Sequence, residues 1–307
     1  MERTRLARSR SLWQPGVPRC ENGGCDDSAP TDRDPERLPC SAQLPPCNVE
    51  GVVVKLQVLG CSGGIGGNLR TTSFLVDEDI LIDAGTGVGS LSLSEMSQVD
   101  HVFVTHSHLD HIACIAFLVD SVGYMRGQPL TVHATAATLQ VLREHIFNWH
   151  VWPDFTTIPN ARRPYLRYER FEVEKPVVLH GRSITAIQAN HVVPAVGFHL
   201  DSGVNSLIFS GDTGQNRSLW QYVNRVENLR YLIIETAFPD KERDLAIASK
   251  HLCPSMLAAE LAELQRPAEI LITHLKPGEA ELTMREIHSC VGRFRPRMLL
   301  HGESFDF

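Results

Sequence analysis

A short histidine-rich stretch carries the clearest chemistry in this chain. The sequence THSHLDH at 105–111 places three histidines and an aspartate within six residues, directly after an apolar run. Imidazole nitrogens and carboxylate oxygens are ligands that zinc prefers. At the end of a strand, residues i and i+2 share a side, so His106 and His108 can bind one ion. Asp110 and His111 follow a turn and can reach a second ion. A histidine-rich surface turn is the alternative, but this density of ligand types favours a metal site.

Apolar segments elsewhere also end in residues that can bind metal or move protons. The expected strands and the residues that end or follow them are 79–83 with Asp83, 183–189 with His191, 206–210 with Asp212, 231–234 with Glu235, and 270–273 with His274. Active sites in α/β architectures collect at strand ends, because rigid strands position what the loops carry. Each residue alone could be a turn aspartate or a capping histidine, but their convergence favours one shared site.

Asp83 has two readings. It can be a metal ligand, or a carboxylate that hydrogen-bonds the neighbouring histidine-rich loop. The second reading is favoured, because metal-bound histidines need acceptors that fix their tautomers.

Two further segments are candidates for substrate binding. The Gly-rich turn at 60–68 is followed by an expected strand at 71–76 rather than a helix, so no helix N-terminus is present to bind a dinucleotide pyrophosphate. A flexible loop whose free N–H groups meet an anionic substrate fits better. Its candidate residues are Ser62, Gly63, Gly64 and Asn68.

The second segment holds four aromatic residues at 147–155. Core packing is the commoner use of aromatic side chains, but Trp149 and Trp152 could also stack on a flat base.

Composition places the chain among ordinary globular proteins. Of its 307 residues, 43% are hydrophobic and 21% are charged. The net charge of −7 argues against a broad nucleic-acid-binding surface, which would normally be basic. No apolar run approaches the roughly 20 residues that span a bilayer. No apolar segment follows the first charged residues, so a secretory signal is not expected. We therefore expect a cytoplasmic protein.

The first 50 residues differ from the rest. They contain seven of the 18 prolines and no lysine, with no sustained periodicity. Such a segment buries too little apolar surface to offset its ordering entropy. We expect a disordered N-terminal extension over 1–50 and a single catalytic domain over 51–307. A mis-assigned start codon is another reading of the extension. Its four cysteines match no zinc-finger spacing: Cys20, Cys25, Cys40 and Cys47.

With these residues assembled, the chain from about Val52 onwards resembles the metallo-β-lactamase superfamily, for which the HxHxDH cluster is highly specific. The resemblance implies an α/β (α+β) fold, a four-layer αββα sandwich with two metal ions at the sheet edges. It implies one ion held by His106, His108 and His191, the other by Asp110, His111 and His274, and Asp212 between them. Zinc is the expected metal, with manganese and iron as alternatives.

Within the superfamily the chain looks most like the class II cyclic-nucleotide phosphodiesterases. The matching stretches are LGCSGG at 59–64, HSHLDHI at 106–112 and ETAF at 235–238. The resemblance implies hydrolysis of 3′,5′-cyclic AMP or GMP to the 5′-nucleotide, by a hydroxide that both ions activate. The expected partner is thus a small cyclic nucleotide, with neither an extended nucleic acid nor a membrane. A homodimer is compatible with this reading.

The chain is also similar to the tRNA 3′-processing endonucleases, which share a glutamate and a later histidine with it. Carried over, the similarity makes His251 the general acid and Glu235 its orienting partner; Asp110 completes the expected catalytic set. Leu-Cys-Pro after His251 departs from that family's pattern. A nuclease of this type is one alternative function, and a thioester or lactone hydrolase is another. The acidic charge and the absence of an inserted Gly/Lys/Arg-rich arm weigh against the nuclease.

Overall fold

Residues 53–307 are described by the structure, a computed structural model. The extension expected over 1–50, with its four cysteines, lies outside these residues. Within 53–307, no helix combines the length and apolar character that a membrane span requires.

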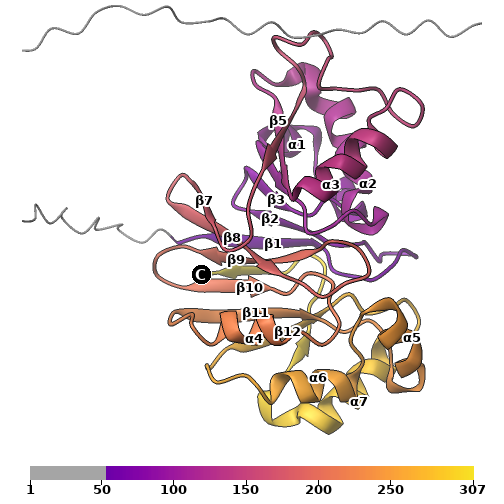
Figure 1. The fold of residues 1–307 in the computed structure, drawn as a ribbon, viewed down its shortest axis with the longest axis vertical. Helices are drawn as coiled ribbons and strands as arrows, with labels where there is room; N and C mark the ends of the chain where they lie inside the picture. The colour runs from indigo at the N-terminus through magenta and orange to yellow at the C-terminus, as the bar shows by residue number, and fades with distance from the viewer. Residues whose placement is uncertain (1–52) are drawn as a thin grey trace, which may run out of the picture. The chain divides into compact units, whose positions relative to one another are not determined.

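The strands of this region form two seven-stranded sheets (Figure 1). Across the first sheet the order is β14 (Ser304–Asp306), β1 (Lys55–Gly60), β2 (Ser73–Val76), β3 (Ile80–Ile82), β4 (His101–Phe103), β5 (Leu130–Ala134) and β6 (Leu166–Arg170). Across the second it is β13 (Arg297–Met298), β12 (Glu269–Thr273), β11 (Leu229–Glu235), β10 (Ser206–Phe209), β9 (Val196–Asp201), β8 (Arg182–Gln188) and β7 (Pro176–Leu179).

Helices cover the outer side of each sheet. In Figure 1, α1 (Leu93–Gln98), α2 (Leu109–Val122) and α3 (Ala136–Val141) lie with the first sheet, and α4 (Arg217–Val223), α5 (Arg243–Ser249), α6 (Pro254–Leu261) and α7 (Ala280–Val291) lie with the second. The predicted four-layer αββα sandwich is confirmed. The helix α3 is followed directly by a π-helical turn at Leu142–Ile146.

The core explains why the strands of the second sheet are almost continuously apolar. In β11, Tyr231 and Ile233 face the first sheet, while Leu232 and Ile234 face the helices. A strand buried on both faces needs apolar residues at every position. Between the sheets, Phe74 and Phe209 meet edge-on with ring centroids 5.1 Å apart. Such an aromatic pair contributes about 0.5–1.5 kcal/mol beyond its buried area.

Parallel pairing brings the functional strand ends together. In the first sheet β3, β4, β5 and β6 are mutually parallel, and in the second β10, β11, β12 and β13 are parallel. The carboxyl ends of parallel strands meet at one edge of a sheet, where sites in α/β folds form. At the start of β8, Arg182 donates two hydrogen bonds, of 2.6 and 2.7 Å, to the two oxygens of Asp79 just before β3. This ion pair joins the two sheets at the opposite strand ends.

Candidate metal centre

The first four candidate ligands come from the connection between β4 and α2. His106 lies in the loop and His108 is the residue that caps α2. The strand spacing predicted for this pair is therefore wrong, because β4 ends at Phe103 and the loop turns into the helix before His108. The loop still brings His106 Nε2 to 3.0 Å from His108 Nδ1. Asp110 and His111 lie in the first turn of α2.

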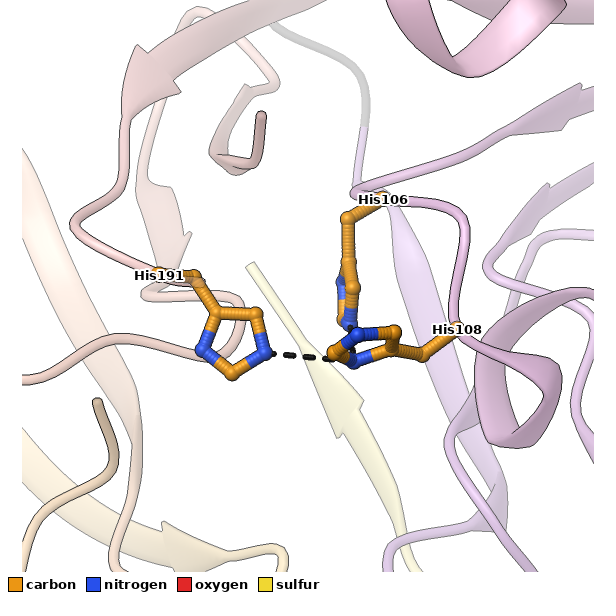
Figure 2. A group of neighbouring side chains, drawn as sticks. All are labelled: His106, His108 and His191. Atoms are coloured by element: carbon orange, nitrogen blue, oxygen red, sulfur yellow. Dashed lines mark hydrogen bonds between the residues drawn. The ribbon is translucent and has the colours of Figure 1, made fainter. Parts of the chain in front are cut away.

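The remaining candidate ligands come from the second sheet. His191 follows β8, Asp212 follows β10 and His274 follows β12. Figure 2 shows His191 pointing toward His106 and His108, with its Nε2 3.2 Å from His108 Nδ1. These three histidines form one group of potential ligand atoms that lie within 4.8 Å of one another.

A second group lies beside the first. It contains Asp110, His111, Asp212 and His274. The Oδ2 atom of Asp212 lies 3.3 Å from His111 Nε2 and 3.4 Å from His274 Nε2. It also lies 3.8 Å from His106 Nε2, which belongs to the first group. Asp212 thus stands between the two groups.

Unpartnered polar atoms test whether these residues fit a metal. His111 Nε2 and Asp212 Oδ1 are buried and have no hydrogen-bond partner among the described residues. Leaving such an atom buried and unpaired costs about 1–3 kcal/mol, and a coordinated cation would satisfy both. Nitrogen and carboxylate oxygen are ligands of divalent transition metals. The residues fit divalent ions.

The protonation state of three of the candidate histidine ligands suits this role. Burial lowers the pKa of His191 to about 4, although Asp212 opposes the shift. Burial also lowers the pKa of His106 and that of His274. A neutral imidazole keeps the lone pair that a metal needs, so these side chains are ready to coordinate at neutral pH.

Asp83 and Thr105 orient one ligand. Asp83 is fully buried and accepts hydrogen bonds from the Thr105 amide and hydroxyl, both at 2.8 Å. His111 Nδ1 lies 2.7 Å from Asp83 Oδ2. This contact fixes the tautomer that turns His111 Nε2 toward the ligand groups. Thr105 was not predicted as a site residue, because its only signal in the sequence is its place directly before His106.

The Lys250 carbonyl orients another ligand in the same way. His191 Nδ1 lies 3.0 Å from this oxygen, which leaves Nε2 facing His108. This contact was not predictable from the sequence, because a backbone carbonyl can accept a hydrogen bond whatever the residue type.

His251 and Glu235 form a pair against the ligand groups. His251 Nδ1 lies 2.9 Å from Glu235 Oε1, and the fully buried Glu235 also accepts from the Thr213 amide at 3.1 Å. The His251 ring centroid lies 4.9 Å from that of His191. Burial lowers the pKa of His251, but the carboxylates of Glu235 and Asp212 more than offset it, so the net pKa is raised. The pair can move a proton, or His251 can join His191 and Asp212 as a ligand.

The Gly-rich turn lies beside this centre, but two of its backbone amides already donate hydrogen bonds to backbone carbonyls. The Ser62 amide donates to Arg70 O at 2.9 Å and the Gly63 amide to Leu275 O at 3.0 Å. The prediction of free amides is therefore wrong at both positions, because the turn pairs with segments on either side. Ser62 and Asn68 line a cavity of about 130 Å³. An added Cβ at Gly64 would meet the Pro277 ring at 2.9 Å.

The two candidate tryptophans are not part of the ligand groups. Trp152 is partly buried against the core and meets the Phe117 ring edge-on, at 5.3 Å between centroids. Phe117 lies nearly two turns along α2 from His111. Trp149 is 63% exposed and donates its backbone N–H to Trp152 O. The packing role is what the structure shows for Trp152.

A match to a protein-family model identifies the family of this chain, and the matched region contains all the candidate ligands. Residues 78–275 match the Beta-lactamase superfamily domain. The chain belongs to the beta-lactamase superfamily. Among its relatives in that superfamily, a probable 3′,5′-cyclic-nucleotide phosphodiesterase of Yersinia pestis is 26% identical over 206 residues, covering 58% of this chain and 57% of that protein. The match thus spans little more than half of that relative's length.

Other relatives widen the comparison. A 3′,5′-cyclic-nucleotide phosphodiesterase of Aliivibrio fischeri is 25% identical over 272 residues, covering 71% of this chain and 80% of that protein. Ribonuclease Z of Halorubrum lacusprofundi is 32% identical over 92 residues, 28% of this chain and 30% of that protein. The crystal structure of unliganded yeast PDE1 superposes with a TM-score of 0.70 at 18% identity, covering 82% of this chain and 99% of that one. That structural similarity shows the fold alone.

Proposed function

We propose that this superfamily member is a metal-dependent phosphodiesterase that hydrolyses 3′,5′-cyclic nucleotides, cyclic AMP or cyclic GMP, to 5′-nucleotides. The observation that carries the proposal is the His251–Glu235 pair, set against two groups of metal ligands. The names of the Yersinia and Aliivibrio relatives support the choice of substrate.

The ligand groups supply the electrophilic part of the chemistry. His106, His108 and His191 would hold one divalent ion, Asp110, His111 and His274 the other, and Asp212 would contact both. Bound ions would neutralise charge on the phosphodiester and lower the pKa of water toward neutrality. The nitrogen-rich set favours zinc, with manganese and iron as alternatives.

His251 supplies the proton for the leaving group. Opening a cyclic phosphodiester expels a ribose oxygen, which is a poor leaving group unless it is protonated. Glu235 accepts a hydrogen bond from His251 Nδ1–H, so the Nε2 atom is the one that carries the proton for transfer. A positioned imidazole accelerates such a step by about 10²–10⁴-fold.

Glu235 keeps that imidazole in place. Its Oε1 atom accepts from both His251 and the Thr213 amide, which directly follows Asp212. The acid is thereby tied to the segment after β10 that carries Asp212. Thioesters and lactones have less need of such a donor, so the pair favours the phosphodiester.

An endoribonuclease is the second candidate, supported by the similarity to ribonuclease Z. The net charge of −7 weighs against it, because a nuclease must attract a long polyanion.

The test combines metal analysis with two substrates. Purified full-length protein is assayed on cyclic AMP and on a tRNA precursor, and its bound metal is measured. We expect two equivalents of metal and release of 5′-AMP. Two equivalents of metal with cleavage of the tRNA precursor alone would retain the metal centre and contradict the cyclic-nucleotide substrate.

A further inference from the structure

The Lys276 ammonium lies at the edge of the candidate metal centre. Its Nζ lies 3.5 Å from His274 Nε2 and donates to Gly63 O at 2.9 Å. His274 Nε2 is the atom that lies 3.4 Å from Asp212 Oδ2. The lysine side chain therefore reaches the ligand groups. In the sequence, Lys276 comes two residues after His274, the last of the candidate ligands.

Close packing keeps the side chain in this position. A Cβ added at Gly63 would lie 2.4 Å from His274 O and 3.1 Å from Lys276 Cδ, so the lysine stem packs directly against the Gly63 backbone. The Lys276 backbone amide donates to Ala237 O at 3.1 Å, just beyond β11. Its ammonium also lies 5.6 Å from the centroid of the Phe238 ring. Lys276 is thus held between the Gly-rich turn and the strand end that carries Glu235.

The ammonium has hydrogen bonds left to make. A lysine has three donors. Within residues 53–307, Lys276 forms no ion pair, whereas Lys175 is paired with Glu172 at 2.6 Å. Gly63 O accepts one hydrogen bond from the ammonium. The other neighbour, His274 Nε2, is a candidate metal ligand, and coordination would use the lone pair that faces the lysine. A cation beside the centre is then left with donors for a ligand from solution.

We infer that Lys276 binds a non-bridging oxygen of the substrate phosphodiester, and the phosphate of the product, at the metal centre. The choice of a phosphodiester rests on the proposed function. A lysine is a point charge that recognises phosphate, and its hydrogen bonds to an anion are stronger than those between neutral groups. A neutral thioester or lactone would offer no charge for Lys276 to bind.

Three variants of the full-length, metal-loaded protein test this inference. Lys276→Met keeps an unbranched stem and removes the charge, and Lys276→Arg keeps the charge. Lys175→Met is the matched control, because it makes the same change in net charge at an exposed ion pair. The dissociation constant of inorganic phosphate is measured by calorimetry. KM and kcat are measured with cyclic AMP and with bis(4-nitrophenyl) phosphate.

For Lys276→Met we expect phosphate affinity to fall and KM to rise by about 10- to 100-fold, which is the range for a hydrogen bond to a charged group. We expect kcat to fall less. Lys276→Arg should recover part of the loss, and Lys175→Met should match the wild type. Bound metal and melting temperature should not change in any variant.

The outcomes separate this inference from the proposed function. Unchanged phosphate affinity in Lys276→Met would overturn the role of Lys276, even if the protein hydrolyses cyclic AMP. Loss of bound metal in that variant would also overturn it, because Lys276 would then support the ligands instead. If the wild type fails on cyclic AMP while Lys276→Met weakens phosphate binding, the substrate is wrong and the inference stands.

Discussion

Asp83, directly after β3, accepts hydrogen bonds from the Thr105 amide and hydroxyl and lies within hydrogen-bond distance of His111 Nδ1. It is not one of the candidate ligands. Its backbone adopts a left-handed conformation, with φ of 58°. A non-glycine residue in that conformation is uncommon and strained. The strain is consistent with the geometry that these three hydrogen bonds require.

Asp83→Asn tests this orienting role. The amide has nearly the same size but lacks the charge, and one of its two oxygen acceptors becomes a donor. We expect metal affinity to fall about 10- to 100-fold, as is typical when an outer partner of a ligand is lost. Competition with a chromogenic chelator measures the change. The exposed Asp244→Asn serves as the control, and equal affinities in the two variants would contradict the role.

His251→Ala tests the proton donor. We expect turnover of cyclic AMP to fall by about 10²–10⁴-fold. Turnover of a nitrophenyl phosphodiester should fall much less, because nitrophenolate leaves without a proton. Steady-state rates on both substrates provide the comparison, with the exposed His145→Ala as control. Equal losses on the two substrates would point instead to His251 as a metal ligand.

Among the elements, the loop that follows β3 packs with almost no space against the first turn of α2 at Gly85. A Cβ added there would lie 2.2 Å from Asp110 O and 2.3 Å from Thr71 Oγ1. The first turn of α2 carries Asp110 and His111, so this contact sets how closely the helix, and with it two ligands, approaches the sheet.

Gly85→Ala should therefore displace the first turn of α2. Overpacking of this kind costs about 1–3 kcal/mol, and we expect both a lower melting temperature and weaker metal binding. Gly89→Ala is the matched control, because its Cβ would meet nothing within 4 Å. Thermal unfolding and metal titration report the two effects. A Gly85→Ala protein that binds metal as tightly as the wild type would show that the turn can shift without moving the ligands.

How far the sequence predicts these elements depends on burial. The strands β10, β11 and β12 are apolar on both faces and were predictable from composition alone. The strand β6 was not predicted, because it lies at a sheet edge with the pattern Leu-Arg-Tyr-Glu-Arg, in which only Leu166 is buried. Edge strands lack the apolar run that marks an inner strand.

Within the site, the predictable residues are those with a motif. The ligands and Glu235 follow apolar strands, and the resemblance to a known family supplied the role of His251. Lys276 carried no such signal, because its place depends on Gly63, more than 200 residues away in the chain. Likewise, the amides of Ser62 and Gly63 are occupied through pairing that no local pattern encodes.

For the molecule as a whole, the ligand set is divided between the two sheets. His106, His108, Asp110 and His111 follow β4 of the first sheet, whereas His191, Asp212 and His274 follow strands of the second. Each group of ligand atoms contains residues that follow strands of the first sheet and residues that follow strands of the second. Bound metal would therefore contribute to the stability of the whole fold, because it binds only when both sheets are in place.

Removal of metal should lower the melting temperature. A ligand present at 100 times its dissociation constant adds about 2.7 kcal/mol, and 1 kcal/mol corresponds to about 2–4 °C in a domain of this size. We expect a chelator to lower the melting temperature by about 5–10 °C and added zinc to restore it. Differential scanning calorimetry measures the shift. Asp212→Ala should not respond to the chelator, and an unresponsive wild type would contradict the metal centre.

The Arg182–Asp79 ion pair has a consequence for how fast metal can enter and leave. His111, Asp212 and His274 are each no more than 2% exposed, so a local separation of the ligand ends of the two sheets would widen the way by which an ion reaches them. Arg182 joins the sheets at the far strand ends and would keep them together while the ligand ends separate. Such an opening would be hinge-like, and the ion pair that would serve as its hinge lies far from the ligands themselves.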